Sequence, residues 1–243
     1  MTEGLSSSAL PQPPSRWLIP VTITVATTAL VALLARLPDS VSATAVGFAF
    51  LAVTYFLVLR TDDSQKIARY GLSLGGLFDP EPLAPLRIGR DIGVAVLWAL
   101  GLALIFLPPF WVGFVWWWHI KTPFHLPPLN SLAGDFSGQL LVIALPEEAF
   151  YRGYLQSALD EVWKPRWRVL GAELGPGILV TSALFALGHL CTEFNAARLA
   201  VFFPSLAFGF LRSRTRGVGA GLVFHALCNL FASYLGQSYG FAR

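Results

Sequence analysis

Long apolar stretches recur along this chain, and they constrain its fold more than any other feature. An α-helix needs about 20 mainly apolar residues to cross the hydrocarbon core of a bilayer. Hydrophobic residues make up 55% of the 243 residues and charged residues only 13%, whereas soluble domains carry about 25% charged residues. We therefore predict an all-α fold, a polytopic bundle of transmembrane helices.

About seven stretches are apolar enough to count as membrane spans, at residues 17–35, 41–59, 92–118, 136–158, 176–194, 199–211 and 217–235. The third is long and contains Pro108-Pro109, and the sixth is short. Either could therefore be a kinked, broken or re-entrant element rather than one plain helix. We therefore predict about seven spans, with a range from six to eight.

The lysines and arginines are distributed unevenly between the loops. If the amino terminus is inside, twelve of the 17 fall on the inner side, four on the outer side, and Arg152 within the membrane. The positive-inside rule then favours an inside amino terminus and an outside carboxyl terminus. The modest net charge of +3 reflects this topology, and no basic patch with interleaved aromatic residues indicates a nucleic-acid partner.

Two adjacent glutamates and an arginine interrupt the fourth apolar stretch, in the segment from Leu145 to Arg152. Glu148 and Arg152 are four residues apart, so their side chains meet on one helix face and can neutralise each other. Glu147 is then a surplus carboxylate, roughly 16 Å from the outer end of its span at the helical rise. A charge at that depth is costly, so it indicates a functional site.

Two later stretches also contain polar residues, His189 in one and His225 with Asn229 in the other. The spacing of four residues puts His225 and Asn229 on one face as a pair of hydrogen-bond donors. Exposing this whole set to lipid would be prohibitively costly. We therefore predict an intramembrane polar cavity shared by three helices.

Such a cavity is suited to amide hydrolysis. A glutamate removed from bulk water is a competent general base for a water molecule. Histidine and asparagine N–H groups can stabilise the oxyanion that develops when this water attacks a carbonyl. Two other classes use the same buried charges: a proton-coupled transporter or channel, and a catalytically silent membrane scaffold. No second copy of the charged segments indicates the internal repeats common in transporters.

Three motifs then give the chain a family resemblance. Residues Glu147 to Arg152 fit EExxxR, Phe185 to His189 fit FxxxH, and His225 to Asn229 fit HxxxN. In this order, the motifs resemble those of the CPBP intramembrane endopeptidases, relatives of the type II CAAX prenyl endopeptidase. The resemblance covers about residues 136–236, and the spans before it match only in being hydrophobic.

The resemblance divides the chain into three parts and implies roles for the first motif. We expect a flexible tail over residues 1–15, amino-terminal spans and loops over 16–135, and a catalytic transmembrane core over 136–236. By resemblance, Glu147 would activate the water, while Glu148 and Arg152 would support the helix and the local charge.

The remaining motif residues would act around this water. By resemblance, His189 would help to hold it, His225 and Asn229 would line the oxyanion site, and Phe185 would pack beside the cavity, where it could contact the substrate. A zinc ion held by Glu147, His189 and His225 is a possible alternative. The HExxH helix is absent and the family is regarded as glutamate-type, so we expect no metal cofactor.

The resemblance implies an intramembrane protease of the glutamate type that cleaves near the carboxyl terminus of a membrane-anchored or lipidated protein. Prenylated proteins, bacteriocins and proteins with carboxyl-terminal sorting helices remain open as substrates. The expected partners are this substrate and the lipid bilayer, with no nucleic acid. The expected location is a prokaryotic cytoplasmic membrane.

Overall fold

The computed structural model describes residues 15–240, and most of them are helical. The predicted flexible tail lies outside the described residues except for Ser15. The elements, in chain order, are α1 (Leu18–Leu34), α2 (Asp39–Thr54), η1 (Tyr55–Leu59), α3 (Ser64–Arg69), η2 (Leu74–Gly76), α4 (Pro85–Trp117), α5 (Leu132–Gly138), η3 (Gln139–Ala144), α6 (Leu145–Glu148), η4 (Ala149–Gln156), α7 (Ser157–Val162), β1 (Trp167–Val169), β2 (Ala172–Leu174), α8 (Pro176–Thr192), η5 (Ala196–Val201), α9 (Phe202–Thr215) and α10 (Gly219–Ser238).

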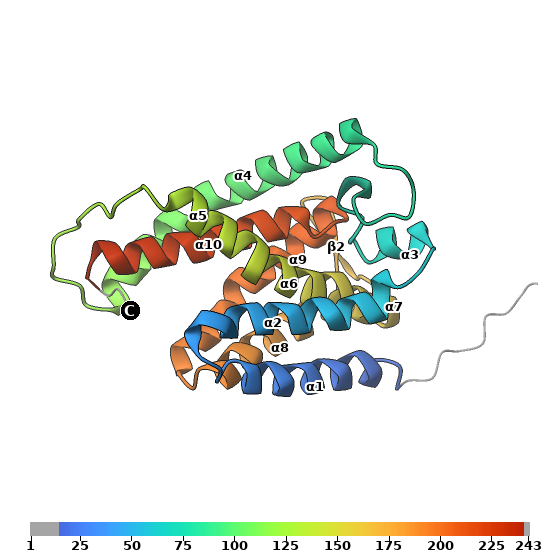
Figure 1. Cartoon of the computed structure of the whole chain (residues 1–243), viewed down its shortest axis with the longest axis horizontal. Coiled ribbons are helices and arrows are strands. Elements are labelled where there is room, and N and C mark those ends of the chain that lie inside the picture. The colour runs from blue at the N-terminus through green and yellow to red at the C-terminus, as the bar shows by residue number, and fades with distance from the viewer. Residues whose placement is uncertain (1–14, 241–243) are drawn as a thin grey trace, which may run out of the picture.

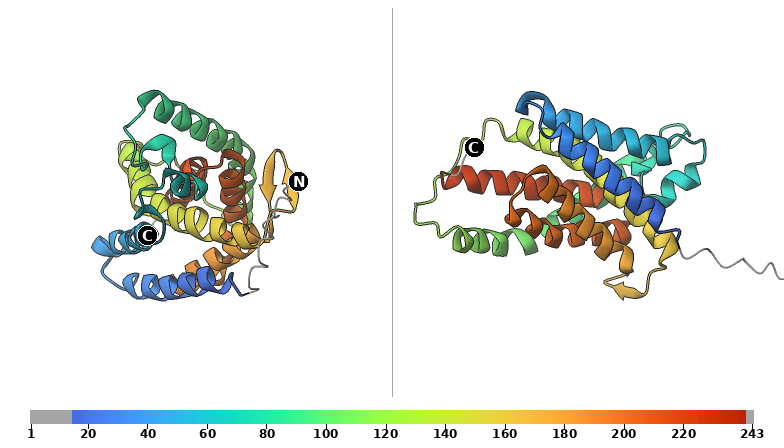
Figure 2. Two further views of the ribbon diagram at one scale, coloured as in Figure 1. Left: turned by 90° about the vertical axis from the view of Figure 1, so that its right-hand side faces the viewer. Right: turned by 90° about the horizontal axis from the view of Figure 1, so that it is seen from below.

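The long helices lie alongside one another in a bundle, and the chain runs back and forth through it (Figures 1 and 2). α10 packs against α4 and α9, while α8 packs against α9 and α1. α1 begins at the end of the bundle where α3 and the end of α7 lie, which we call the amino-terminal end. α10 finishes at the opposite, carboxyl-terminal end, beside the connection between α4 and α5 (Figure 1).

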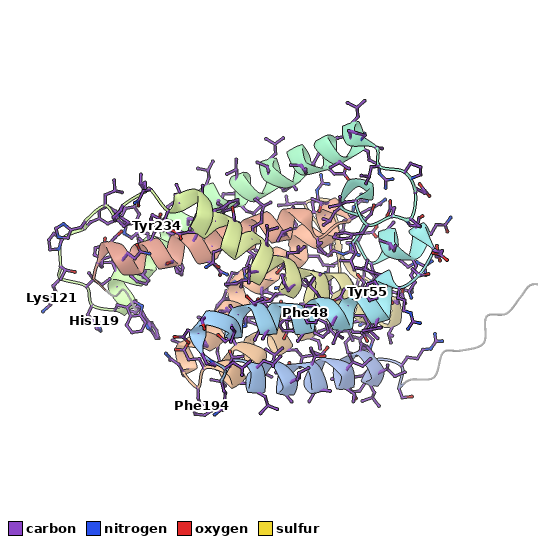
Figure 3. The ribbon with its side chains drawn as sticks, viewed as in Figure 1. Phe48, Tyr55, His119, Lys121, Phe194 and Tyr234 are labelled. Carbon is purple, nitrogen blue, oxygen red and sulfur yellow. The ribbon has the colours of Figure 1, made fainter. Side chains whose placement is uncertain are left out.

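The surface of the bundle is that of a membrane protein. Among the described residues, three helices are long and apolar enough to cross a bilayer: Asp39–Leu59, Pro85–Trp117 and Gly219–Ser238. On α4, Leu97, Leu104 and Val112 are each more than 70% exposed, an arrangement that lipid tolerates and water does not. Figure 3 labels further exposed aromatic side chains, such as Phe48 on α2.

The third and sixth apolar stretches, which the sequence marked as irregular, form α4 and α9. α4 continues from Pro85 to Trp117 as one helix that includes Pro108 and Pro109, so the third stretch is not broken there. Pro85 stands in the first turn, where a missing N–H removes no helical hydrogen bond. α9 is short, as its sequence indicated, and the 3-10 helix η5 precedes it.

The all-α prediction is wrong at one small element. β1 and β2 form a two-stranded antiparallel hairpin in which Trp167 pairs with Leu174 and Val169 with Ala172. Leu170 and Gly171 connect the strands with φ angles of 47° and 82°. Positive φ at both turn positions matches the right-handed twist of the strands, which is the geometry that closes a tight hairpin.

One close contact holds α2 against the helix that carries the glutamates. Pro146 lacks an N–H, so the carbonyl of Val142, four residues earlier, loses its α-helical donor. Gly47 of α2 lies beside this carbonyl: a Cβ added to Gly47 would be 2.6 Å from Val142 O and 3.2 Å from Pro146 Cγ. The absence of a side chain at residue 47 therefore allows the two backbones to approach.

We predict that Gly47→Ala destabilises the protein by about 1–3 kcal/mol, because the added methyl group forces the two helices apart. Thermal unfolding in detergent measures the effect as a lower midpoint temperature. The matched control is Gly93→Ala on α4, where an added Cβ would meet nothing within 4 Å. Equal midpoints for the two variants would show that the Gly47 contact does not require a glycine.

Candidate active site

The two motif glutamates lie on a helix of alternating geometry. α5, η3, α6, η4 and α7 adjoin without a gap, and the short α6 that contains Glu147 and Glu148 is flanked by π-helical segments at Gln139–Ala144 and Ala149–Gln156. π-helical turns are rare and occur mostly at functional sites. They rotate the following side chains relative to a regular α-helix, which adjusts where the charged residues point.

Glu148 forms the centre of a buried charged cluster. Its Oε1 is 3.1 Å from Arg152 Nη1, and both side chains are fully buried. The same oxygen is 3.0 Å from His225 Nδ1 on α10. The structure thus confirms the predicted contact between Glu148 and Arg152 and adds His225 as a third member.

Two residues outside the motifs complete this cluster. Arg152 Nη2 donates a hydrogen bond of 2.7 Å to the buried hydroxyl of Ser205 on α9. Gly221 on α10 leaves room for the acid, since an added Cβ would lie 2.9 Å from Glu148 Oε2. Buried charges are tolerated when they are paired and hydrogen-bonded; here Glu148 and Arg152 pair with each other, and Ser205 accepts a hydrogen bond from the arginine.

Aromatic rings enclose the charged cluster on its other faces. The guanidinium carbon of Arg152 lies 4.4 Å from the ring centre of Phe185 and 5.0 Å from that of Phe208, within the range of cation–π attraction. The ring of His225 stacks on Phe208 at 4.6 Å and 14°. These contacts fix the orientations of the arginine and the imidazole.

Glu147 is placed differently from its neighbour. Its side chain keeps 13% of its surface exposed, and its Oε2 lies 3.7 Å from His225 Nε2. This distance is longer than a direct hydrogen bond. The imidazole of His225 therefore stands between the two glutamates, with Nδ1 on Glu148 and Nε2 towards Glu147.

Glu147 lines a cavity of about 720 Å³ together with His189 and Asn229. Tyr151 and Gln139 contribute further polar groups to its wall. The three separate motifs therefore contribute residues to one cavity. Glu148, Arg152, Phe185 and His225 are buried behind it.

The hydrogen bond of His189 determines which of its nitrogens can act in the cavity. Its Nδ1 is 3.0 Å from the carbonyl oxygen of Phe185. Because a carbonyl only accepts, Nδ1 carries the hydrogen, and Nε2 of the neutral ring is left as an acceptor. The ring also packs against Phe185 at 4.4 Å, which holds it in place.

The cavity extends towards the carboxyl-terminal end of the bundle. Its lining there includes Asp39 at the start of α2, and Glu193 and Arg198 in the connection after α8. Arg198 and Glu193 form an ion pair with an Nη2–Oε2 distance of 2.5 Å. Charged residues thus stand at this end of the cavity, and apolar ones such as Val46 and Phe50 line its interior.

The alternative of a zinc ion held by Glu147, His189 and His225 stays a prediction. Among the described residues, no group of three or more His, Cys, Asp or Glu side chains is arranged to hold a metal ion. Two other histidines, His119 and His125, lie in the connection between α4 and α5, and neither lines the cavity; Figure 3 labels His119 in this connection.

Sequence reasoning missed three residues that contact the motif residues: Ser205, Phe208 and Tyr151. Serine and phenylalanine are common in apolar helices, so nothing in the pattern of α9 distinguishes the first two. Tyr151 lies inside the first motif, at one of its unspecified positions, and it lines the cavity. The hydroxyl of Tyr151 approaches α8 at Gly188, where an added Cβ would be only 2.9 Å away.

Residues 130–231 match the family model described as type II CAAX prenyl endopeptidase Rce1-like. This segment contains all three motifs, and the match confirms the family resemblance that they suggested. No curated protein and no solved structure matches the chain.

We predict that Glu148→Gln lowers the free energy of unfolding by about 3–5 kcal/mol, because it leaves the buried Arg152 without a counter-charge. Unfolding in mixed detergent micelles measures this change. The control is Glu161→Gln, which removes the acid of an exposed pair with Arg69 at 3.9 Å. An exposed pair contributes about 0–1 kcal/mol, so similar losses in both variants would contradict the central role of the Glu148 pair.

Proposed function

Taking the resemblance to the CAAX prenyl endopeptidase family as the premise, we propose that this chain is an intramembrane endopeptidase of the glutamate type. One observation carries the proposal: Glu147 lines a cavity with His189 and Asn229, while a buried cluster behind it balances the second glutamate. An acid, a histidine and an amide from three helices therefore meet at one cavity, where a peptide and water could enter.

His189 and Glu147 are suited to orient the attacking water. Both line the cavity, and both offer acceptors, the carboxylate of Glu147 and Nε2 of the neutral His189. A water molecule that donates one hydrogen to each keeps its lone pairs free. Those lone pairs can then be directed at the carbonyl carbon of a bound peptide.

The hydrolysis then proceeds with one proton relayed by Glu147. The water oxygen bonds to the carbonyl carbon as Glu147 takes a proton from it. The side-chain amide of Asn229 donates a hydrogen bond to the oxyanion of the tetrahedral intermediate. When the C–N bond breaks, Glu147 returns its proton to the leaving nitrogen, and the products are a carboxylic acid and an amine; the proton of the acid then passes to the amine, which gives a carboxylate and an ammonium group.

The cluster behind the cavity supports this proton transfer. Glu148 and Arg152 compensate each other, so the remaining charge depends on Glu147 and His225, whose closest atoms are 3.7 Å apart. A proton that passes between Glu147 and His225 leaves the total charge of this pair unchanged, so that transfer adds no net charge to the apolar interior.

We further propose that the chain crosses a prokaryotic cytoplasmic membrane about seven times, with the amino terminus inside and the carboxyl terminus outside. The alternating direction of α1, α2, α4, α5–α7, α8, α9 and α10 supports this count. The basic loops then lie inside, and the end of the cavity with Asp39, Glu193 and Arg198 faces outward.

The proposed substrate is a membrane-anchored or lipidated protein that is cut near its carboxyl terminus. Apolar lining residues, including Val31, Val46 and Phe50, are suited to an extended apolar segment that enters from the bilayer. Prenylated, bacteriocin-type and sorting-signal substrates all present such a segment beside a scissile peptide bond.

We expect Glu147→Gln to abolish cleavage without unfolding the protein, because the amide cannot accept a proton from water. Membrane proteins from cells that contain wild type or Glu147→Gln are compared by mass spectrometry of their carboxyl-terminal peptides. Truncated products should occur only with the wild type. If both strains contain the same truncated products, the protease mechanism is wrong, and a transporter or scaffold becomes the better description.

On the substrate found in this way, Asn229→Ala should lower kcat by about 100–1,000-fold with a smaller effect on KM, because it removes an oxyanion donor. Gln139→Ala is the matched control, since Gln139 is another amide in the lining of the same cavity. Equal loss of kcat in the two variants would show that Asn229 has no specific role in stabilising the oxyanion.

A further inference from the structure

A second cavity lies at the amino-terminal end of the bundle and is separate from the candidate active site. It has a volume of about 590 Å³ and is formed by segments that are distant in sequence. Its lining residues are Arg16, Ile19, Pro20, Arg69, Tyr70, Tyr154, Ala158, Glu161, Val162 and Lys164. Figure 1 shows the start of α1, α3 and the end of α7 together at this end.

Three cations converge on this cavity from three parts of the chain. Arg16 precedes α1, Arg69 is the last residue of α3, and Lys164 follows α7. The cavity has one acid, Glu161, at 3.9 Å from Arg69 with both side chains well exposed. Such an exposed pair is weak and exchanges readily with another anion. The lining therefore has an excess positive charge.

Aromatic side chains place this cavity at the level of the lipid headgroups. Trp17 and Trp163 pack against each other with their ring centres 5.8 Å apart, and each is adjacent in sequence to a lining cation, Arg16 or Lys164. Tryptophan side chains concentrate at the membrane–water boundary. The basic residues of the cavity are therefore positioned where phosphate groups of lipids lie.

The remaining lining residues complete an amphipathic site. Burial, together with the nearby Glu161, raises the pKa of Tyr70, which keeps its hydroxyl protonated as a donor. Ile19 is 63% exposed on α1 and lines the cavity with Pro20. An apolar surface thus continues from the basic cavity along α1 towards the membrane interior.

We propose that this cavity binds the headgroup of an anionic phospholipid. Arg16, Arg69 and Lys164 would contact the phosphate, the hydroxyl of Tyr70 would donate to it, and an acyl chain would follow the apolar side of α1. Basic cavities between helices on the inner side of membrane proteins have the charge and depth for such headgroups. The inference stands independently of the proposed protease activity.

The test uses the full-length protein in neutral detergent and native mass spectrometry to measure the dissociation constants of three probes: phosphatidylglycerol, phosphatidylcholine and inorganic phosphate. Each basic residue near a membrane surface contributes about fivefold in affinity for anionic lipid. Arg69→Gln with Lys164→Gln should therefore weaken phosphatidylglycerol binding by roughly 25-fold, and Lys164→Gln alone by about fivefold.

The matched control is Arg166→Gln with Arg168→Gln, which removes the same charge from the exposed hairpin at the same end. It should bind phosphatidylglycerol as the wild type does, and phosphatidylcholine should bind more weakly than phosphatidylglycerol to the wild type. Equal weakening in the control pair would overturn the proposal in favour of general electrostatic attraction. Inorganic phosphate that binds as tightly as phosphatidylglycerol would overturn it in favour of a soluble anion. If the double variant does not fold, Lys164→Gln alone decides between these outcomes.

Discussion

The buried ion pair between Glu148 and Arg152 determines how the polar interior of this protein is built. Removing two charges from water costs several kcal/mol per ion, and their attraction compensates this cost only when further hydrogen bonds are made. The neighbours of the pair meet this requirement from other helices. Ser205 on α9 accepts from Arg152, His225 on α10 meets Glu148, and Gly221 leaves the space that the carboxylate occupies. The pair therefore draws α9 and α10 around the helix that carries both glutamates.

This arrangement separates the two adjacent glutamates into different roles. Consecutive side chains on a helix point about 100° apart, so Glu148 faces the bundle interior while Glu147 reaches the cavity. His225 contacts both through its two nitrogens. A buried cluster with compensated charge thus stands directly behind a carboxylate that water can reach, and the proposed chemistry uses this difference between residues 147 and 148.

The sequence predicts those parts of the site that depend on local spacing. The contact between Glu148 and Arg152 follows from their separation of four residues, and the helical class follows from composition and apolar length. The contacts of Ser205 and Phe208 could not be predicted, because they depend on how α9 rotates and packs, and neither residue is unusual in an apolar helix. The π-helical segments around α6 have no residue signature beyond Pro146. The hairpin was missed because two strands of three residues leave almost no periodic pattern.

The two cavities lie towards opposite ends of the same bundle and differ in charge: acids and an arginine line the first, whereas three cations and one acid line the second. Tyr151 lines the candidate active site and Tyr154 lines the basic cavity, only one helical turn further along η4. Water for the proposed hydrolysis would need a polar route into the membrane, and the lining residues Asp39 and Arg198 lie at the end where such a route would begin. The basic end has the opposite charge balance, and the phospholipid proposed there would hold this end of the bundle at the level of the headgroups. Because a single helix contacts both cavities, a lipid bound at the basic end would set the depth of Glu147 relative to the headgroups. In the proposed protease, this depth would determine which peptide bond of an anchored substrate reaches the carboxylate.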